Sequence, residues 1–287
     1  PEVVLPAIVD ADDPEPPRPG EECDESCRHQ VLVAARQRHA YAVSLLRSWD
    51  EARAELAAAA ETGEQDQLED LVVREAAARQ QARDVMESVS SAWYWLVESA
   101  WLEKGMDEAM FQMARAFEYL ADLSTDPQEV EDDGSRARMA LWALIRNFPQ
   151  SERVPEAHLS LADSYAGVKR CDRAVGHYDQ AIETGGLSLR GYALYRQAQC
   201  LRMMGALDAA QETLEELSEH LDQHPEVPGA AELREGLRWE SKLLEAARQP
   251  SRERVSWPPP SPHPGTRTVV ALGLKPVVVG GRIAGDA

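Results

Sequence analysis

Apolar residues recur every three or four positions through most of the chain, which is the spacing of one face of an α-helix. One such stripe runs over residues 28–60 and another over residues 65–103, with Thr62-Gly63 as a stop signal between them. Two long helices joined by a short turn predict an antiparallel hairpin, about 50 Å long at 1.5 Å per residue. No strand-like alternation occurs before residue 266.

Residues 155–217 contain the pattern of a helix pair twice, at a period of thirty-six residues. Apolar positions of the first copy are apolar again in the second; the pairs are Ala162 and Ala198, Tyr165 and Leu201, Ala174 and Ala210, Tyr178 and Leu214, and Ala181 and Leu217. Each copy is expected to turn at a glycine, Gly167 in the first and Gly205 in the second. A helix pair repeated at this period cannot bury its apolar face alone, so the copies are expected to stack.

This repeat resembles the tetratricopeptide repeat, which places a large, a small and an aromatic residue on its first helix and Ala, aromatic and Ala on its second. The first copy has these residue types at Leu161, Ala162, Tyr165, Ala174, Tyr178 and Ala181. The second copy matches more loosely, with Gln197 at a usually apolar position and Leu in place of both aromatics.

Two short segments, Asn147 to Ser151 and Pro155 to His158, resemble the joints between repeats in bacterial cell-envelope proteins. The two families concerned are the periplasmic coordinator of the Tol–Pal system and the lipoprotein subunit of the outer-membrane β-barrel assembly machine. The resemblance covers about residues 107–217. It implies an adaptor in the periplasm or cell envelope, with the cytoplasm as the alternative.

Residues 107–123 have the pattern of the first helix of a degenerate repeat. Met110, Met113, Ala114 and Phe117 hold the positions of Leu194, Gln197, Ala198 and Leu201. An acidic stretch, residues 124–135, is expected to be an inserted loop that delays the partner helix, either solvated or used for recognition. A competing frame pairs residues 91–104 with 107–120, but the first frame puts Pro149 and Pro155 at a joint between repeats.

Towards the C-terminus, His224-Pro225 to Pro228-Gly229 breaks the helical pattern, and an amphipathic helix follows that resembles the capping helix of a repeat stack. Residues 248–265 form a proline-rich linker, and residues 266–283 have β-type composition. At the N-terminus, residues 1–27 are rich in proline and acidic residues, which is typical of a disordered or extended arm.

The predicted fold is therefore all-α, with a long helical hairpin, a tetratricopeptide-like α-solenoid, and extended N- and C-terminal tails. Its parts are an acidic arm (1–27), the hairpin (28–104), the repeats with a capping helix (105–248), and a linker with a β-type docking tail (249–287).

The formal net charge of −20 argues against nucleic acid and anionic membrane surfaces as partners, and favours a solvated surface or a basic partner. No run of about eighteen apolar residues exists, so no transmembrane segment is expected, and any membrane association would come through partners. The chain begins at Pro1 without Met, signal core or lipobox, so we expect a processed or trimmed form.

The chain contains no nucleophile elbow, phosphate loop or zinc-protease helix, so it is expected to be no enzyme and to need no cofactor or metal. Two weak metal candidates are the pair His220 and His224 and the triplet Cys23, Cys27 and His29. Cys23 and Cys27 are spaced to close a small disulfide loop in an oxidising compartment. A bridge between Cys171 and Cys200 is possible, but their places on two successive repeat helices favour unpaired, half-buried thiols.

In the tetratricopeptide family, fixed positions of each first helix line a concave groove that holds a partner segment. Counted from helix starts at Asp107, Pro155 and Gly191, the candidate groove residues are Phe111, Arg115, Tyr119, Leu159, Asp163, Tyr192, Tyr195, Gln199 and Arg202. The alternative is that flanking helices or the chain's own tail fill the groove. The sequence thus predicts a protein-binding adaptor for a peptide segment or for complex subunits.

A second hypothesis makes the tail the functional part of a structural assembly subunit. Its apolar residues would add a strand to a partner's sheet; they are Val269, Val270, Leu272, Leu274, Val277, Val278 and Val279.

Overall fold

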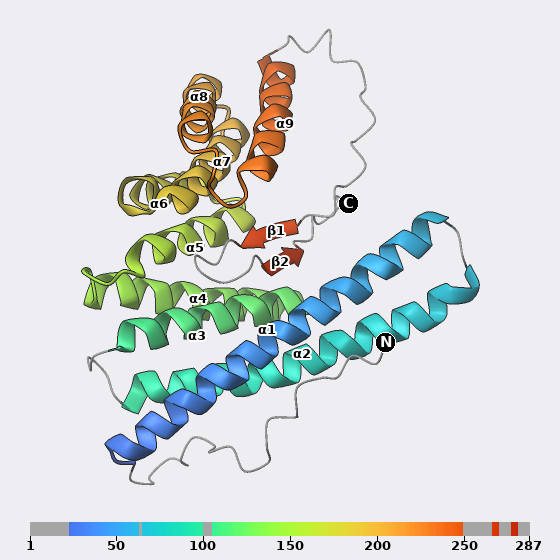
Figure 1. Ribbon diagram of the computed structural model, residues 1–287, viewed down its shortest axis with the longest axis vertical. Helices are drawn as coiled ribbons and strands as arrows, with labels where there is room; N and C mark the ends of the chain where they lie inside the picture. The colour runs from blue at the N-terminus through green and yellow to red at the C-terminus, as the bar shows by residue number, and fades with distance from the viewer. Residues whose placement is uncertain (1–22, 63–64, 100–104, 249–265, 270–276, 281–287) are drawn as a thin grey trace. The chain divides into compact units, whose positions relative to one another are not determined.

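The computed structural model describes residues 23–62, 65–99, 105–248, 266–269 and 277–280 (Figure 1). Within these ranges the chain is almost entirely helical, which confirms the all-α prediction. The helices are α1 (Glu25–Thr62), α2 (Gln65–Ser99), α3 (Met106–Leu123), α4 (Pro127–Asn147), α5 (Val154–Gly167), α6 (Cys171–Thr184), α7 (Leu187–Met203), α8 (Leu207–Gln223) and α9 (Ala230–Arg248). Two short strands follow, β1 (Thr266–Val269) and β2 (Val277–Gly280).

The helices form two compact units whose division falls within α4, the first unit ending at Ala140 and the second beginning at Leu141. The predicted parts divided the chain near residue 104 instead. In the structure, α3 packs on α2 and the first part of α4 belongs to the same unit. None of the helices in the described ranges is long and apolar enough to cross a membrane.

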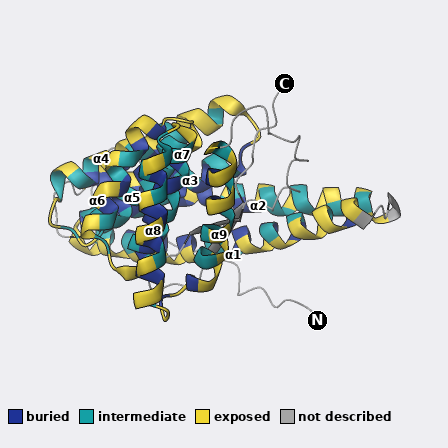
Figure 2. Ribbon diagram, turned by 90° about the horizontal axis from the view of Figure 1, so that it is seen from above, coloured by how far each residue is buried: buried dark blue, intermediate teal, exposed yellow. Residues whose placement is uncertain are grey.

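The first unit is built on the predicted antiparallel hairpin of α1 and α2, which pack along each other (Figure 1). Its buried side chains gather in the half of the hairpin nearer its two open ends, with Ala35, Leu46, Met86, Val89 and Trp93 among the least exposed. Near the turn, by contrast, residues 67–81 are all half-buried or exposed (Figure 2). The core of this unit therefore lies where α3 joins the hairpin.

Helix α1 begins at Glu25, three residues before the predicted start. Asp24 explains the difference, because its Oδ1 accepts a hydrogen bond of 2.8 Å from the backbone N–H of Cys27 and so caps the first turn. The last three residues assigned to the acidic arm are thus helical. The rest of that arm, residues 1–22, lies outside the described residues.

The acidic stretch 124–135 is not a loop, and this prediction is wrong. Helix α4 starts at Pro127, so only residues 124–126 connect it to α3. Asp126 Oδ1 accepts a hydrogen bond of 2.8 Å from the Gln128 backbone N–H, and proline is favoured at the first helical position that follows such a cap. A side-chain bond of 2.9 Å from Gln128 to Asp132 adds support one turn later. Local capping outweighs the low helix propensity of the Asp- and Gly-containing sequence.

The second unit contains the two predicted antiparallel helix pairs, α5 with α6 and α7 with α8, and α6 packs on α7 (Figure 1). The two turns have the same backbone hydrogen bond at the thirty-six-residue offset, from Arg170 N to Tyr165 O (2.8 Å) and from Ala206 N to Leu201 O (2.9 Å). This agreement confirms two stacked helix pairs. Helix α7 begins at Leu187, four residues before the predicted start at Gly191.

The residue equivalent to Gly205 in the first turn is Lys169, not Gly167 as predicted. Lys169 has a φ of 59° and Gly205 a φ of 79°, so both adopt the left-handed conformation that the turn requires. A side chain disfavours this conformation by about 1 kcal/mol relative to glycine. The turn geometry is therefore retained in the first copy although its glycine lies two residues earlier.

Small side chains line the contacts between the repeat helices. Seven alanines on α5, α6, α7 and α8 are at most 1% exposed: Ala157, Ala162, Ala174, Ala181, Ala193, Ala198 and Ala210. Larger buried side chains, including Tyr178 and Leu194, fill the space between these positions. Helix α9 closes the end of the stack by packing Leu244 against Ala198 and Leu214, which confirms the predicted capping helix.

The β-type tail forms strands in two short segments. β1 pairs with β2 in antiparallel fashion, with Thr266 opposite Gly280 and Val269 opposite Val277. The proline-rich linker and the tail residues Val270, Leu272 and Leu274 lie outside the described residues.

We expect Ala174→Leu to lower the free energy of unfolding by about 1–3 kcal/mol, because the added side chain cannot fit between α6 and its neighbours without moving a helix. Urea unfolding followed by circular dichroism measures this change. The matched control is Ala246→Leu at an exposed position of α9, which we expect to stay within about 0.5 kcal/mol of the parent. Equal stability of the two variants would contradict close packing at Ala174.

Candidate functional site

The three candidate groove residues on α3 belong to the core of the first unit. Phe111 is 8% and Tyr119 is 5% exposed, so neither ring is presented to a partner. Arg115 donates hydrogen bonds to Glu118 (2.6 Å) and to the Tyr119 hydroxyl (2.8 Å). The contacts of the Tyr119 ring include the imidazole of His39 on α1, which it meets edge-on with 6.4 Å between ring centroids. On α3, flanking helices occupy the predicted groove positions.

His39 lies at the centre of this core and was not identified from the sequence. It accepts a hydrogen bond of 3.1 Å at Nδ1 from the indole N–H of Trp93 on α2. Burial lowers the pKa of His39 to about 4, with a further contribution from the positive charge of Arg115 and an opposing one from Glu108. The ring is therefore neutral at neutral pH. The sequence signal was a polar residue four positions after Ala35, within the apolar stripe of α1.

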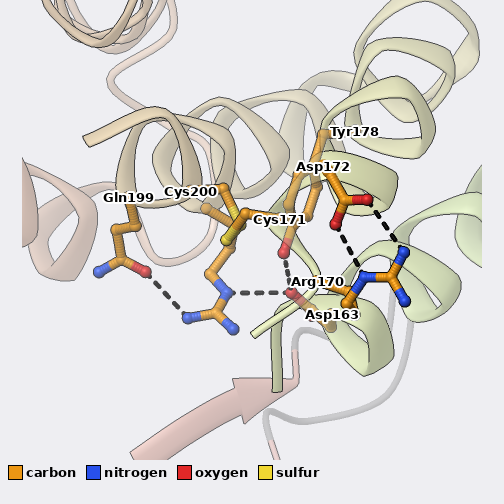
Figure 3. Close-up of a disulfide and its surroundings, with 8 residues drawn as sticks. Asp163, Arg170, Cys171, Asp172, Tyr178, Gln199 and Cys200 are labelled. Atoms are coloured by element: carbon orange, nitrogen blue, oxygen red, sulfur yellow. Dashed lines mark hydrogen bonds and ion pairs between the residues drawn. A yellow bond between two sulfur atoms is a disulfide. The ribbon is translucent and has the colours of Figure 1, made fainter. Parts of the chain in front are cut away.

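In the second unit, the carboxylate of Asp163 on α5 joins three helices (Figure 3). Its Oδ1 accepts hydrogen bonds from the Tyr178 hydroxyl on α6 (2.7 Å) and from Arg196 Nε on α7 (2.9 Å). Arg196 also donates to Gln199 Oε1 at 2.9 Å. Burial, together with the neighbouring Asp163 charge, raises the pKa of Tyr178 well above its ordinary value, so its hydroxyl remains a donor.

A disulfide bond between Cys171 and Cys200 lies beside this network (Figure 3). The prediction of unpaired thiols is wrong because α6 and α7 pack against each other with the start of α6 opposite the end of α7, which brings the two Cα atoms to 5.2 Å. Cys23 and Cys27 also form a disulfide, with Cα atoms 5.4 Å apart, as their spacing allowed. No group of three or more metal-ligating side chains is found within the described ranges.

Of the remaining candidate groove residues, two contact helix α9, and the others are half-buried on α5 and α7. Helix α9 covers Tyr195, whose ring would lie 2.9 Å from a Cβ at Gly236, and Arg202, which donates a hydrogen bond to the buried carboxylate of Glu240. The other half-buried side chains on α5 and α7, with Arg196 added, form what we call the α5–α7 surface: Leu159, Asp163, Tyr192, Arg196 and Gln199. Within each helix these residues lie three or four positions apart, and the Asp163 network links the two helices.

Sequence reasoning missed a second group of aromatic side chains, which we call the α4–α6 cluster: Trp142, His158, Tyr165 and His177. The Trp142 indole N–H donates to the Tyr165 hydroxyl at 3.3 Å, and the indole meets the His177 ring edge-on at 5.1 Å. His177 also stacks on Tyr165, with the rings 5.8 Å apart and inclined by 16°. The available signal was Trp142 itself, placed off the apolar stripe formed by Leu141 and Leu144.

The two histidines of the cluster share one hydrogen bond of 3.0 Å between their Nδ1 atoms, so one ring donates and the other accepts. Burial lowers the pKa of both rings, and that of His177 falls to about 4 because the nearby His158 adds to the effect. At neutral pH the α4–α6 cluster is therefore an uncharged aromatic surface.

The first unit also contains a cleft of about 370 Å³ between α2, α3 and α4. Arg83 crosses it and donates to Glu87 (2.9 Å) and Glu129 (2.8 Å), while Arg136 pairs with Asp133 at 3.0 Å. Its arginines are thus engaged with neighbouring carboxylates.

No known protein-family model matches the chain, and no curated protein shows significant sequence similarity to it. Any function must therefore be argued from the side chains described above.

We expect acid to destabilise the first unit through His39. The pKa of His39 is about 4 in the folded protein and about 6.5 when unfolded, so the unfolded state binds the proton first. The free energy of unfolding therefore has its full value above about pH 6.5 and decreases by roughly 3 kcal/mol as the pH falls towards 4. Urea unfolding at a series of pH values measures it.

In that series, we expect the free energy of unfolding of His39→Gln to fall less with acid than that of the parent, by about the same 3 kcal/mol. Gln keeps an acceptor for Trp93 but does not titrate in this range. The control is His29→Gln, an exposed histidine of the same helix, which should follow the parent. Parallel curves for His39→Gln and the parent would contradict a neutral buried imidazole.

Proposed function

We propose that the chain is a non-catalytic adaptor that holds a segment of a partner protein on its α5–α7 surface. The observation that carries this proposal is the Asp163 network, because it fixes the half-buried Arg196 guanidinium one turn after the half-buried Tyr192. Aromatic and arginine side chains supply most of the energy at protein interfaces. Side chains that are already held in place lose less conformational entropy on binding.

The capping helix limits this proposal to part of the predicted groove. Tyr195 and Arg202 serve the packing of α9, and Phe111 and Tyr119 serve the core of the first unit. The binding role therefore falls to Leu159, Asp163, Tyr192 and Gln199, with Arg196 added to the residues named from the sequence.

The two disulfides support an oxidising compartment for this adaptor, because cytoplasmic thiols are kept reduced. A bacterial cell envelope meets this condition, in agreement with the resemblance of the repeat joints. The partners we propose are proteins of a complex in that compartment. The net charge of −20 disfavours nucleic acid in the same role.

We expect Tyr192→Ala to weaken binding of peptides selected from a random displayed library against the full chain, by about tenfold or more. Isothermal titration of two or three selected peptides measures the change, and circular dichroism checks that the variant is folded. The matched control is Tyr94→Ala, since Tyr94 is 50% exposed on α2. Selected peptides that bind the two variants equally well would count against the α5–α7 surface.

A second candidate function rests on the β1–β2 pair. Two strands of four residues each are only marginally stable by themselves, and a third strand supplied by a partner would stabilise them. Of the proposed docking residues, Val269, Val277, Val278 and Val279 lie in these strands. The tail would then act as the assembly element and the helices as its carrier.

If the tail is the assembly element, deletion of residues 250–287 should abolish co-purification of partner subunits from native extract while leaving the helical circular dichroism signal intact. Mass spectrometry of the captured proteins provides the measurement. Tyr192→Ala in the same extract separates the two candidates, because it alters only the α5–α7 surface. Recovery of the same partners by the tail-deleted chain would exclude the second candidate.

A further inference from the structure

The α4–α6 cluster presents one exposed indole, that of Trp142, beside three half-buried rings. Trp142 is 46% exposed, and so is Val168 at the turn between α5 and α6. Soluble proteins rarely leave contiguous apolar surface uncovered unless it binds something. The rings of Trp142, Tyr165 and His177 contact one another, so the exposed indole belongs to a continuous aromatic surface and is not an isolated side chain.

The indole of Trp142 is held in position by its neighbours. Its N–H is bound by the Tyr165 hydroxyl, and its ring meets the edge of His177, which is itself hydrogen-bonded to His158. A ring fixed in this way loses little freedom when a ligand covers it, which favours binding.

Exposed cations accompany the cluster, although the chain as a whole carries −20. The Arg173 guanidinium lies 5.7 Å from the centre of the Tyr165 ring, and exposed Arg146 follows Trp142 by one turn of α4. Lys169 adds a third exposed cation at the turn. Throughout the described part of the chain, no carboxylate forms an ion pair with any of the three. Arg170, by contrast, is neutralised by Asp172 at 3.0 Å.

We propose that the α4–α6 cluster is a second docking surface, which binds an acidic segment of a protein partner. An apolar side chain of that segment would cover Trp142, while its carboxylates would pair with Arg146 and Arg173. Charge complementarity carries the choice of occupant, because free cations beside an aromatic surface match an acidic, partly apolar peptide. The overall charge of −20 disfavours both a nucleic acid and a second copy of the chain.

This inference does not depend on the α5–α7 surface, because none of its residues belongs to that surface. Failure of one proposal would leave the other standing, and Tyr192→Ala should not affect binding here.

Fluorescence anisotropy of a fluorescein-labelled peptide, Asp-Glu-Leu-Glu-Asp, titrated with the full chain tests the proposal. The comparison probe is its uncharged counterpart, Asn-Gln-Leu-Gln-Asn. We expect the acidic probe to bind and the uncharged one to bind at least about tenfold more weakly. Raising the salt concentration from about 0.05 M to about 0.3 M should weaken binding of the acidic probe.

Three variants locate the contact: Trp142→Ala, Arg146→Glu and Arg173→Glu. Each is expected to lower the affinity for the acidic probe by about fivefold or more. The matched controls are Tyr94→Ala for an exposed aromatic and Arg238→Glu for an exposed arginine of α9, both expected to bind like the parent. Circular dichroism confirms that each variant is folded.

Two results would overturn the proposal. One is an acidic probe that binds no better than the uncharged probe. The other is a Trp142→Ala variant that dissociates an oligomer of the parent in sedimentation velocity, which would make the cluster a contact between copies of this chain.

Discussion

The close approach of α5, α6, α7 and α8 depends on side chains that consist of a single methyl group. Alanines at the helix contacts are almost completely buried, and larger residues such as Tyr178 and Leu194 occupy the spaces between them. Because the backbones can come near each other, one carboxylate on α5 reaches donors on both α6 and α7, and two cysteines on α6 and α7 meet in a disulfide. The polar network and the covalent link are both consequences of small side chains in the right places.

The same spacing brings together the residues of the α5–α7 surface, which we propose for a partner. Helix α9 contacts the side chains of Tyr195 and Arg202, whereas Tyr192, Asp163 and Arg196 are half-buried. The α4–α6 cluster shares only α5 with that surface and uses other residues of this helix, and its exposed indole is accompanied by the exposed side chains of Arg146 and Arg173. If both proposals hold, the chain has two separate surfaces for partner proteins.

Local patterns in the sequence predicted the elements well, and the reasons are visible in particular residues. The thirty-six-residue period led to the two stacked helix pairs, whose turns agree hydrogen bond for hydrogen bond. The left-handed turn residue in the first copy is Lys169, which no rule based on glycine could identify. The stretch 124–135 was misjudged because its composition suggested a loop, whereas Asp126 and Pro127 start a helix.

The candidate site was less predictable because it depends on contacts between elements distant in sequence. Family positions indicated Phe111 and Tyr119, but the packing of α3 beside His39 and Trp93 buries them. Asp163 and Tyr192 were named from the family positions as groove residues and are half-buried in the structure, whereas Arg196, which bonds to Asp163, was not named. The pairing of Cys171 with Cys200 also follows from how α6 and α7 pack, which their separation in sequence does not reveal.

Peptide mapping of the disulfides tests the stacking of α6 on α7 most directly. Digestion with trypsin without reduction should yield residues 171–173 linked to residues 197–202, because these peptides carry Cys171 and Cys200. Cys23 and Cys27 should appear together in one peptide that gains two hydrogens on reduction. Free Cys171 and Cys200 in protein purified under oxidising conditions, or either of them linked to Cys23 or Cys27, would contradict the packing of the repeat helices described above.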